Sequence, residues 1–148
     1  MKDIKKYSVR LVREDKMEYT QDKIQSPSAG AELLNKVFQM DSQPTEIFVM
    51  LALDTKKQPI GCFLISQGCI NMTIVSPRDV FQRALLVNAH SIIVAHNHPS
   101  GDINPSREDK ILTDSLKKAG EILGIEVLDS LVVGEDGDYY SFLSNGEL

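Results

Sequence analysis

The sequence predicts an α/β sandwich, in which helices cover a mixed β-sheet that contains hairpin-linked strands. Short apolar runs suited to strands alternate with segments whose apolar residues recur at helical spacing. Two consecutive strand-like runs are separated only by a four-residue polar turn, which indicates a β-hairpin and argues against a strictly parallel sheet. The chain has 148 residues, the size of one compact domain, and we assign residues 1–148 to a single domain.

The N-terminal half is expected to contain a strand, a helix and the hairpin. Residues 4–13 are typical of an extended strand, in which Tyr7, Val9 and Leu11 alternate with polar residues. Ser26 and Pro27 are typical of a helix N-cap and first helical position, and this helix should end near Met40. Its expected apolar face comprises Ala29, Leu33, Leu34, Val37 and Phe38. The strands are predicted at residues 4–13, 46–53 and 59–66, with the hairpin turn at 54–57.

The C-terminal half is expected to add two helices and further strands. Ser76, Pro77 and Asp79 form a strong helix start, and Gly124 is a good helix terminator. We expect helices at residues 78–89 and 106–123, and strands at residues 72–75, 91–95, 125–133 and 139–142. Their inward faces should hold Val80, Phe81, Ala84 and Leu85 in the first helix, and Ile111, Leu112, Leu116, Ala119, Ile122 and Leu123 in the second. His90 is expected to end the first helix, near its C-terminal dipole.

Charge and cysteine content narrow the class of protein. The formal net charge of -5 argues against tight, non-specific binding to nucleic acid, which needs surplus Lys and Arg. Cys62 and Cys69 do not form a C-x-x-C pair, so we exclude a cysteine zinc knuckle and expect reduced thiols in a cytoplasmic protein. We identify neither a signal peptide nor a membrane-spanning run. We interpret one basic run as a solvated strand face: Lys2, Lys5, Lys6, Arg10 and Arg13.

The pattern that carries chemistry begins where the apolar run SIIVA meets His96-Asn97-His98. Residues i and i+2 of a strand point to the same face, so both imidazoles should reach one metal ion. A loop shaped by Pro and Gly then leads to a helix whose first turn carries Asp109. Two histidines and one carboxylate leave the fourth position of a tetrahedral zinc ion for water, as in catalytic sites. We therefore predict zinc bound by His96, His98 and Asp109.

A second interpretation of Ser106-x-x-Asp109 is open, because this spacing is also typical of a helix capping box. The chain contains its own control, since Ser76 and Asp79 share the spacing without a nearby histidine. The spacing alone favours capping. The two histidines at the strand exit, joined to it by the shaped loop, favour the metal site.

The whole pattern resembles a known signature. His96-x-His98-Pro99, six further residues and Ser106-x-x-Asp109 match the JAMM (JAB/MPN) metalloprotease signature at every defined position. The neighbouring sequence resembles the RadC-like bacterial branch over about residues 28–145, through HNHPSGDINPS, Gly68, SPRDVFQRAL, Asn88-Ala89 and Leu128-Asp129.

The resemblance implies a cytidine-deaminase-like α/β/α fold around one zinc ion, with His96, His98 and Asp109 as its ligands. It further implies that Ser106 contacts the oxyanion of the transition state, and that a glutamate at the start of an upstream strand is the general base. Glu46 occupies that place. A carboxylate there can take a proton from water and deliver it to the leaving amine. Without the resemblance, Glu46 would read as a solvent-facing residue at a strand start.

Two features depart from the family pattern. Ser130 stands where RadC-like chains usually have histidine after Leu-Asp, so a contact behind the ligands or with substrate is expected to be absent. Longer relatives also carry an N-terminal helix-hairpin-helix DNA-binding domain. We do not expect one in this chain, which agrees with its acidic charge.

The leading hypothesis is a JAMM-type zinc hydrolase that cleaves an amide or isopeptide bond of a peptide or protein substrate. One alternative is a non-catalytic, zinc-stabilised module that binds a partner. Another is a DNA-associated protein that acts in repair or on mobile elements. A zinc deaminase is disfavoured because its H-x-E and P-C-x-x-C patterns are absent. The physiological substrate and the oligomeric state stay open.

Overall fold

The computed structural model describes residues 1–20, 22–68 and 75–148. Its strands are β1 (Ile47–Leu53), β2 (Pro59–Gln67), β3 (Ser91–Asn97), β4 (Glu126–Val133) and β5 (Tyr139–Ser141). Its helices are α1 (Pro27–Phe38), a 3₁₀ turn at Met40–Ser42, α2 (Pro77–Leu86) and α3 (Arg107–Leu123). The strand predicted at 72–75 lies outside the described residues except for Val75. No helix in the described part of the chain is long and apolar enough to cross a membrane.

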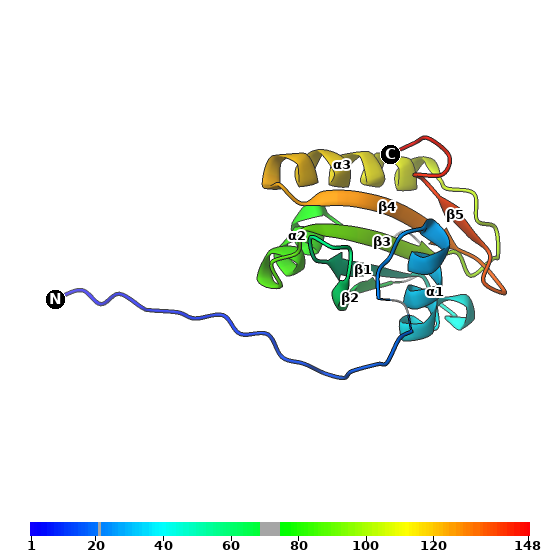
Figure 1. The fold of residues 1–148 in the computed structure, drawn as a ribbon. Coiled ribbons are helices and arrows are strands. Elements are labelled where there is room, and N and C mark those ends of the chain that lie inside the picture. The colour runs from blue at the N-terminus through cyan, green and yellow to red at the C-terminus, as the bar shows by residue number, and fades with distance from the viewer. Residues whose placement is uncertain (21, 69–74) are drawn as a thin grey trace.

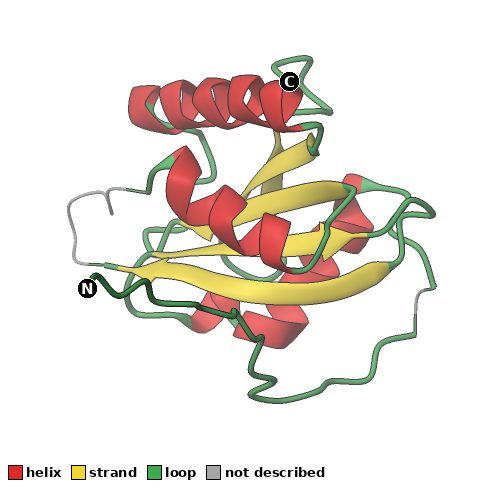
Figure 2. Ribbon diagram, turned by 90° about the vertical axis from the view of Figure 1, so that its left-hand side faces the viewer, coloured by secondary structure: helices red, strands yellow, loops and turns green. Residues whose placement is uncertain are grey.

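Within the described residues, the five strands form one mixed sheet in the order β2-β1-β3-β4-β5 (Figure 1). The β1–β2 hairpin and the β1–β3 pair are antiparallel, whereas β3 and β4 are parallel. Helix α1 packs on one face of this sheet, and α2 and α3 lie on the other (Figure 2). The expected α/β sandwich with a mixed sheet is therefore confirmed.

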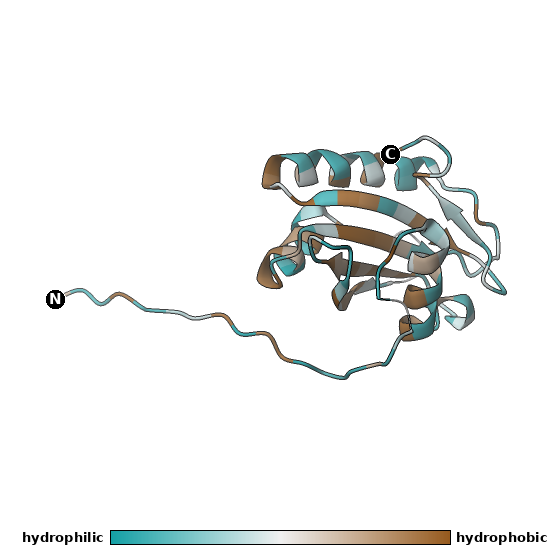
Figure 3. Ribbon diagram, in the orientation of Figure 1, coloured by the Kyte–Doolittle hydropathy of each residue, from teal (hydrophilic) through white to brown (hydrophobic). Residues whose placement is uncertain are grey.

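Strand β1 reads as a continuous apolar run because it is buried on both faces. Val49 and Leu51 join the apolar cluster beneath α1, while Met50 and Ala52 join the cluster beneath α2 and α3. Figure 3 shows the same hydrophobic character along the central strands. Packing on both faces fixes the sheet, so the residues where β1 begins and β3 ends have fixed positions.

The strand predicted at residues 4–13 is wrong for the single chain. Residues 1–17, here called the N-terminal arm, leave the folded body without secondary structure (Figure 1). Tyr7, Val9 and Leu11, which carry the alternating pattern, are 80%, 73% and 53% exposed. Alternation indicates a strand only where a neighbouring strand supplies hydrogen bonds, and the arm has no such neighbour among the described residues.

The predicted helix faces are too wide. Fewer residues of α3 are buried than predicted, and two of them, Asp109 and Thr113, are polar. Ile111, Ile122 and Leu123 are exposed. Leu85 of α2 is exposed as well, and this helix ends at Leu86, before the predicted end at residue 89. His90 therefore does not end a helix. Its backbone N–H donates to the Leu53 carbonyl, and so aligns the start of β3 with the end of β1.

Candidate metal centre

The end of β3 brings the two histidines together. His96 is the penultimate residue of β3, His98 is the first residue after it, and their Nε2 atoms lie 3.2 Å apart. Asp109, in the first turn of α3, places Oδ1 3.2 Å from His96 Nε2 and Oδ2 3.3 Å from His98 Nε2. One possible ligand atom from each of Glu46, His96, His98 and Asp109 lies within 4.8 Å of the others.

These separations suit a small divalent cation. Tetrahedral zinc with bonds of roughly 2.0–2.1 Å holds its ligand atoms about 3.3 Å apart. The three separations among the histidine nitrogens and the Asp109 oxygens are 3.2, 3.2 and 3.3 Å. The donor set is also the one that zinc takes in catalytic sites, two imidazoles and a carboxylate. The residues present therefore fit the ion that the sequence predicts.

The His98 ring is held in the tautomer that a metal ligand needs. Its Nδ1 atom lies 2.6 Å from the backbone carbonyl oxygen of Asp102. A carbonyl oxygen only accepts hydrogen bonds, so Nδ1 carries the proton and donates it. In the neutral ring the Nε2 lone pair then faces His96 and Asp109 and is available to a cation, whereas in the protonated ring Nε2–H donates to Asp109.

The His96 ring is oriented by packing instead. The ring is buried, and Phe48 of β1 stacks on it with ring centroids 6.0 Å apart and planes inclined by 7°. Its Nδ1 atom has no hydrogen-bond partner among the described residues. The apolar wall therefore orients the ring so that Nε2 faces Asp109 and His98.

Asp109 serves the helix and the cluster at once. Its Oδ2 atom accepts the Ser106 backbone N–H at 2.8 Å, and its own N–H donates to Ser106 Oγ at 3.1 Å, which together form a capping box. Burial opposes ionisation of this carboxyl, but hydrogen bonds from His96 and His98 hold its pKa well below the usual range. The capping interpretation of Ser106-x-x-Asp109 is therefore confirmed, and the same carboxylate also faces the two histidines, as the metal-site interpretation requires.

Glu46 immediately precedes β1 and borders the cluster on its open side. Its Oε1 atom is 4.0 Å from His96 Nε2, further than the Asp109 oxygens. The side chains of Glu46 and His98 are 19% and 18% exposed, against 4% for His96 and 2% for Asp109. The site thus has a buried side and a side open to solvent, where Glu46 stands.

Asn97 is a positioning residue that the sequence analysis missed. Its Oδ1 atom accepts the Ile47 backbone N–H at 2.7 Å, and its Nδ2 atom donates to the Thr45 carbonyl at 3.1 Å. These two bonds clamp the backbone on either side of Glu46. The sequence did offer a signal for this role, an amide side chain between two candidate ligands at the end of a buried strand. A buried polar group without hydrogen bonds is costly, so such a side chain is expected to bind nearby backbone.

Ser106 and Ser130 occupy different places relative to the cluster. Ser106 Oγ accepts the Asp109 N–H, and the described residues offer its hydroxyl proton no acceptor. Ser130, the departure from the family pattern noted in the sequence, is a buried residue of β4 and accepts a hydrogen bond from the Thr113 hydroxyl of α3 at 3.0 Å. Thr113 lies one helical turn beyond Asp109, so this contact supports α3 behind the ligand.

Comparison with known proteins gives the family of the fold. A family model described as RadC-like JAB domain matches residues 24–147. A UPF0758 protein of Thermotoga maritima is 47% identical over 103 residues, covering 70% of this chain and 46% of the relative. UPF0758 proteins of Methanosarcina acetivorans and Pelobacter propionicus are 47% and 48% identical over 107 and 103 residues. The matched region spans 44–46% of the length of these relatives, and their shared name states no activity.

Proposed function

This chain belongs to the RadC-like JAB domain family, and from that membership and the site we propose that it is a zinc-dependent hydrolase that cleaves an amide or isopeptide bond in a peptide or protein. The observation that carries the proposal is the spacing of His96, His98 and Asp109, which matches tetrahedral zinc, beside a carboxylate on the solvent side. A cytoplasmic location forms part of the proposal, because Cys62 is a free thiol.

Each polar residue of the site has a separate role in this proposal. His96, His98 and Asp109 would hold zinc, which when bound polarises a carbonyl and lowers the pKa of water to about 7. Glu46, the general base, takes a proton from the attacking water and delivers it to the leaving amine. The Ser106 hydroxyl, oriented by the Asp109 N–H, donates to the oxyanion that develops on the substrate carbonyl.

The experiment uses zinc-loaded protein and the substitution Glu46→Gln. Each protein is incubated with a cell extract, and newly formed amino groups are labelled and identified by mass spectrometry. We expect the unaltered chain to release new α-amines or lysine ε-amines. Glu46→Gln should bind one zinc ion per chain and release none above background, because an amide cannot accept the proton.

The outcomes separate the parts of the proposal. New amines from Glu46→Gln at the unaltered rate would remove Glu46 from the mechanism. No new amines from a zinc-loaded unaltered chain would refute hydrolysis and favour the non-catalytic binding module. His98→Ala serves as the metal control, because it should lose both zinc and activity. Activity in zinc-free His98→Ala would contradict the assignment of the site.

A further inference from the structure

Strand β2 is an apolar edge of the sheet. Within the described residues it pairs only with β1, and none of its nine residues is charged. Leu64 pairs with Val49, so its side chain points to the α1 face of the sheet, yet α1 packs over β1, β3 and β4. Ile60 and Leu64 are 43% and 44% exposed. An uncharged edge of this kind is a template for a further strand, and folded proteins usually cover it.

The N-terminal arm has the sequence of such a strand. Between residues 4 and 13, one face of an extended chain would carry Tyr7, Val9 and Leu11 in its middle, flanked by Lys5 and Arg13. The other face would carry Lys6, Ser8 and Arg10 in its middle, flanked by Ile4 and Val12. All of these residues are exposed in the single chain. The alternation of hydrophobic and hydrophilic residues along the arm is visible in Figure 3. In the single chain, no surface among the described residues buries the apolar face of the arm.

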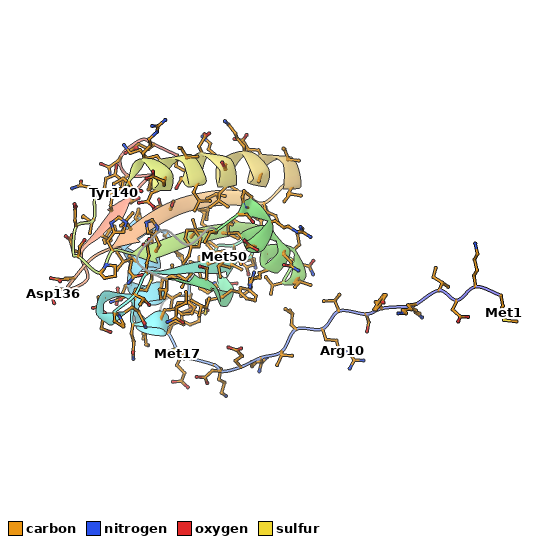
Figure 4. The ribbon with its side chains drawn as sticks, turned by 180° about the vertical axis from the view of Figure 1, so that it is seen from behind. Met1, Arg10, Met17, Met50, Asp136 and Tyr140 are labelled. Atoms are coloured by element: carbon orange, nitrogen blue, oxygen red, sulfur yellow. The ribbon has the colours of Figure 1, made fainter. Side chains whose placement is uncertain are left out.

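The arm starts from a fixed point and leads away from its own body. The Ile24 backbone N–H donates to the Lys57 carbonyl at 2.9 Å, and the Lys36 ammonium donates to the Glu18 carbonyl at 2.7 Å. Figure 4 shows Met17 at the margin of the folded body and Met1 far beyond it. An extended chain rises roughly 3.3 Å per residue, so the arm reaches about 55 Å from its anchor, enough to cross a neighbouring molecule.

Charge makes a second copy of this chain a suitable neighbour. Residues 1–13 contain five basic residues and one acidic residue, a net charge of +4. The remaining 135 residues contain eleven basic and twenty acidic residues, a net charge of -9. A basic arm is therefore attracted to the acidic body of another copy, and this attraction favours the encounter and its orientation.

We propose that residues 4–13 add as a further strand to β2 of a second copy, and that the second arm does the same in return. Tyr7, Val9 and Leu11 would cover the apolar side of β2 beside Leu64, and the arm backbone would pair with the β2 edge that is unpaired among the described residues. This is strand addition combined with exchange of an identical element between two chains. The proposal concerns a surface outside the metal centre and goes beyond the proposed hydrolase activity.

The test uses the full chain, with its mass measured by light scattering over a range of concentrations and amide exchange measured by mass spectrometry. We expect a dimer in which residues 4–13 exchange slowly. The double substitution Ser8→Pro and Val9→Pro should give a monomer with fast exchange in the arm. Neighbouring N–H groups of a strand point to opposite edges, so one of the two prolines removes a donor to β2. Lys2→Pro, outside the segment, should leave the dimer intact.

A substitution in β2 itself provides the second part of the test. Leu64→Lys places a charge on an already exposed position of β2 and should also give a monomer with unchanged zinc content. A monomeric unaltered chain would overturn the proposal, whether its arm exchanged quickly or was protected on its own β2. A dimer that survives the two prolines would place the interface elsewhere. Salt-sensitive, arm-dependent binding to duplex DNA without dimerisation would identify a different partner.

Discussion

The starts of α2 and α3 share a sequence motif but differ in what faces it. Ser76 and Asp79 form a capping box at α2, as Ser106 and Asp109 do at α3. At α2 the serine hydroxyl also donates to Asp79 Oδ2 at 2.9 Å, which uses up its proton. At α3 the serine hydroxyl has no such bond, and the aspartate meets two imidazoles instead.

Capping and metal binding are therefore compatible uses of one carboxylate. The cap occupies Oδ2 of Asp109 through a backbone N–H, while Oδ1 and the remaining lone pair of Oδ2 face the histidines. The helix start supplies a fixed carboxylate in both places. Only α3 has the end of β3 opposite it, and this strand exit converts a structural motif into a candidate metal site.

The largest effect that tests this comparison is the loss of metal from one helix start only. Asp109→Asn keeps an oxygen for the Ser106 N–H but removes the charge of the ligand. We expect zinc affinity to fall by more than about 100-fold, which exceeds the usual loss from a supporting contact. Asp79→Asn, the matched substitution at α2, should retain one zinc ion per chain. Elemental analysis and competition with a chelator measure both.

Far-UV circular dichroism of the two variants checks that each helix still forms. Equal zinc affinity in Asp109→Asn and the unaltered chain would show that the α3 motif is a cap alone. Zinc loss in Asp79→Asn would show that the two helix starts are not independent.

An intermediate effect separates the two serines. Ser106→Ala and Ser76→Ala should each destabilise the protein by about 1 kcal/mol, because each removes an N-cap acceptor. Only Ser106→Ala should lower turnover, by about 10²–10³-fold, since only that hydroxyl is free to donate to an oxyanion. Urea denaturation measures the first quantity, and amine release measures the second. Equal turnover in both variants would reduce Ser106 to a cap.

The sequence predicted the elements whose local signals agree with their tertiary environment. The hairpin followed from two apolar runs and a polar turn, and the starts of α1, α2 and α3 followed from their caps. The convergence of His96 and His98 followed from strand geometry. The carboxylate at Asp109 was assigned to the cluster from the two histidines and the shaped loop that precede it, because the identical spacing at Asp79 has no nearby histidine and forms a cap alone.

The wrong predictions concern apolar patterns whose packing partner cannot be identified from the sequence. Ile122 and Leu123 continue a helical stripe, but the sheet beneath α3 is narrower than the stripe. A close contact lies on the inward side of α3: a Cβ at Gly120 would lie 2.3 Å from the Ile125 carbonyl oxygen, so the helix packs against the chain that enters β4 through its glycine. The clamp of Asn97 around Glu46 also escaped prediction, because it joins residues fifty positions apart.

The smallest effect is a difference in pH dependence between the two helix starts. In metal-free protein the hydrogen bond that His98 donates to the Asp109 carboxylate raises the pKa of His98 above its ordinary value of 6.5, against the opposing effect of burial. The stability that this contributes is complete below pH 6.5 and is lost as pH rises through the raised pKa. Asp79 has a lowered pKa, mainly through the Ser76 hydroxyl, so its contribution is present above its ordinary value and lost only in acid.

As pH rises from 6.5 through the raised pKa of His98, loss of the His98–Asp109 contact should therefore lower the Tm of metal-free protein, whereas the α2 start should contribute no change over this range. Zinc affinity should instead increase as pH rises. Binding displaces the His98 proton, so affinity falls by about tenfold per pH unit below the raised pKa. Thermal unfolding of metal-free protein and chelator competition at each pH measure these trends. In Asp109→Asn the decline of Tm should disappear, and a decline that persists there would assign it to groups outside the cluster.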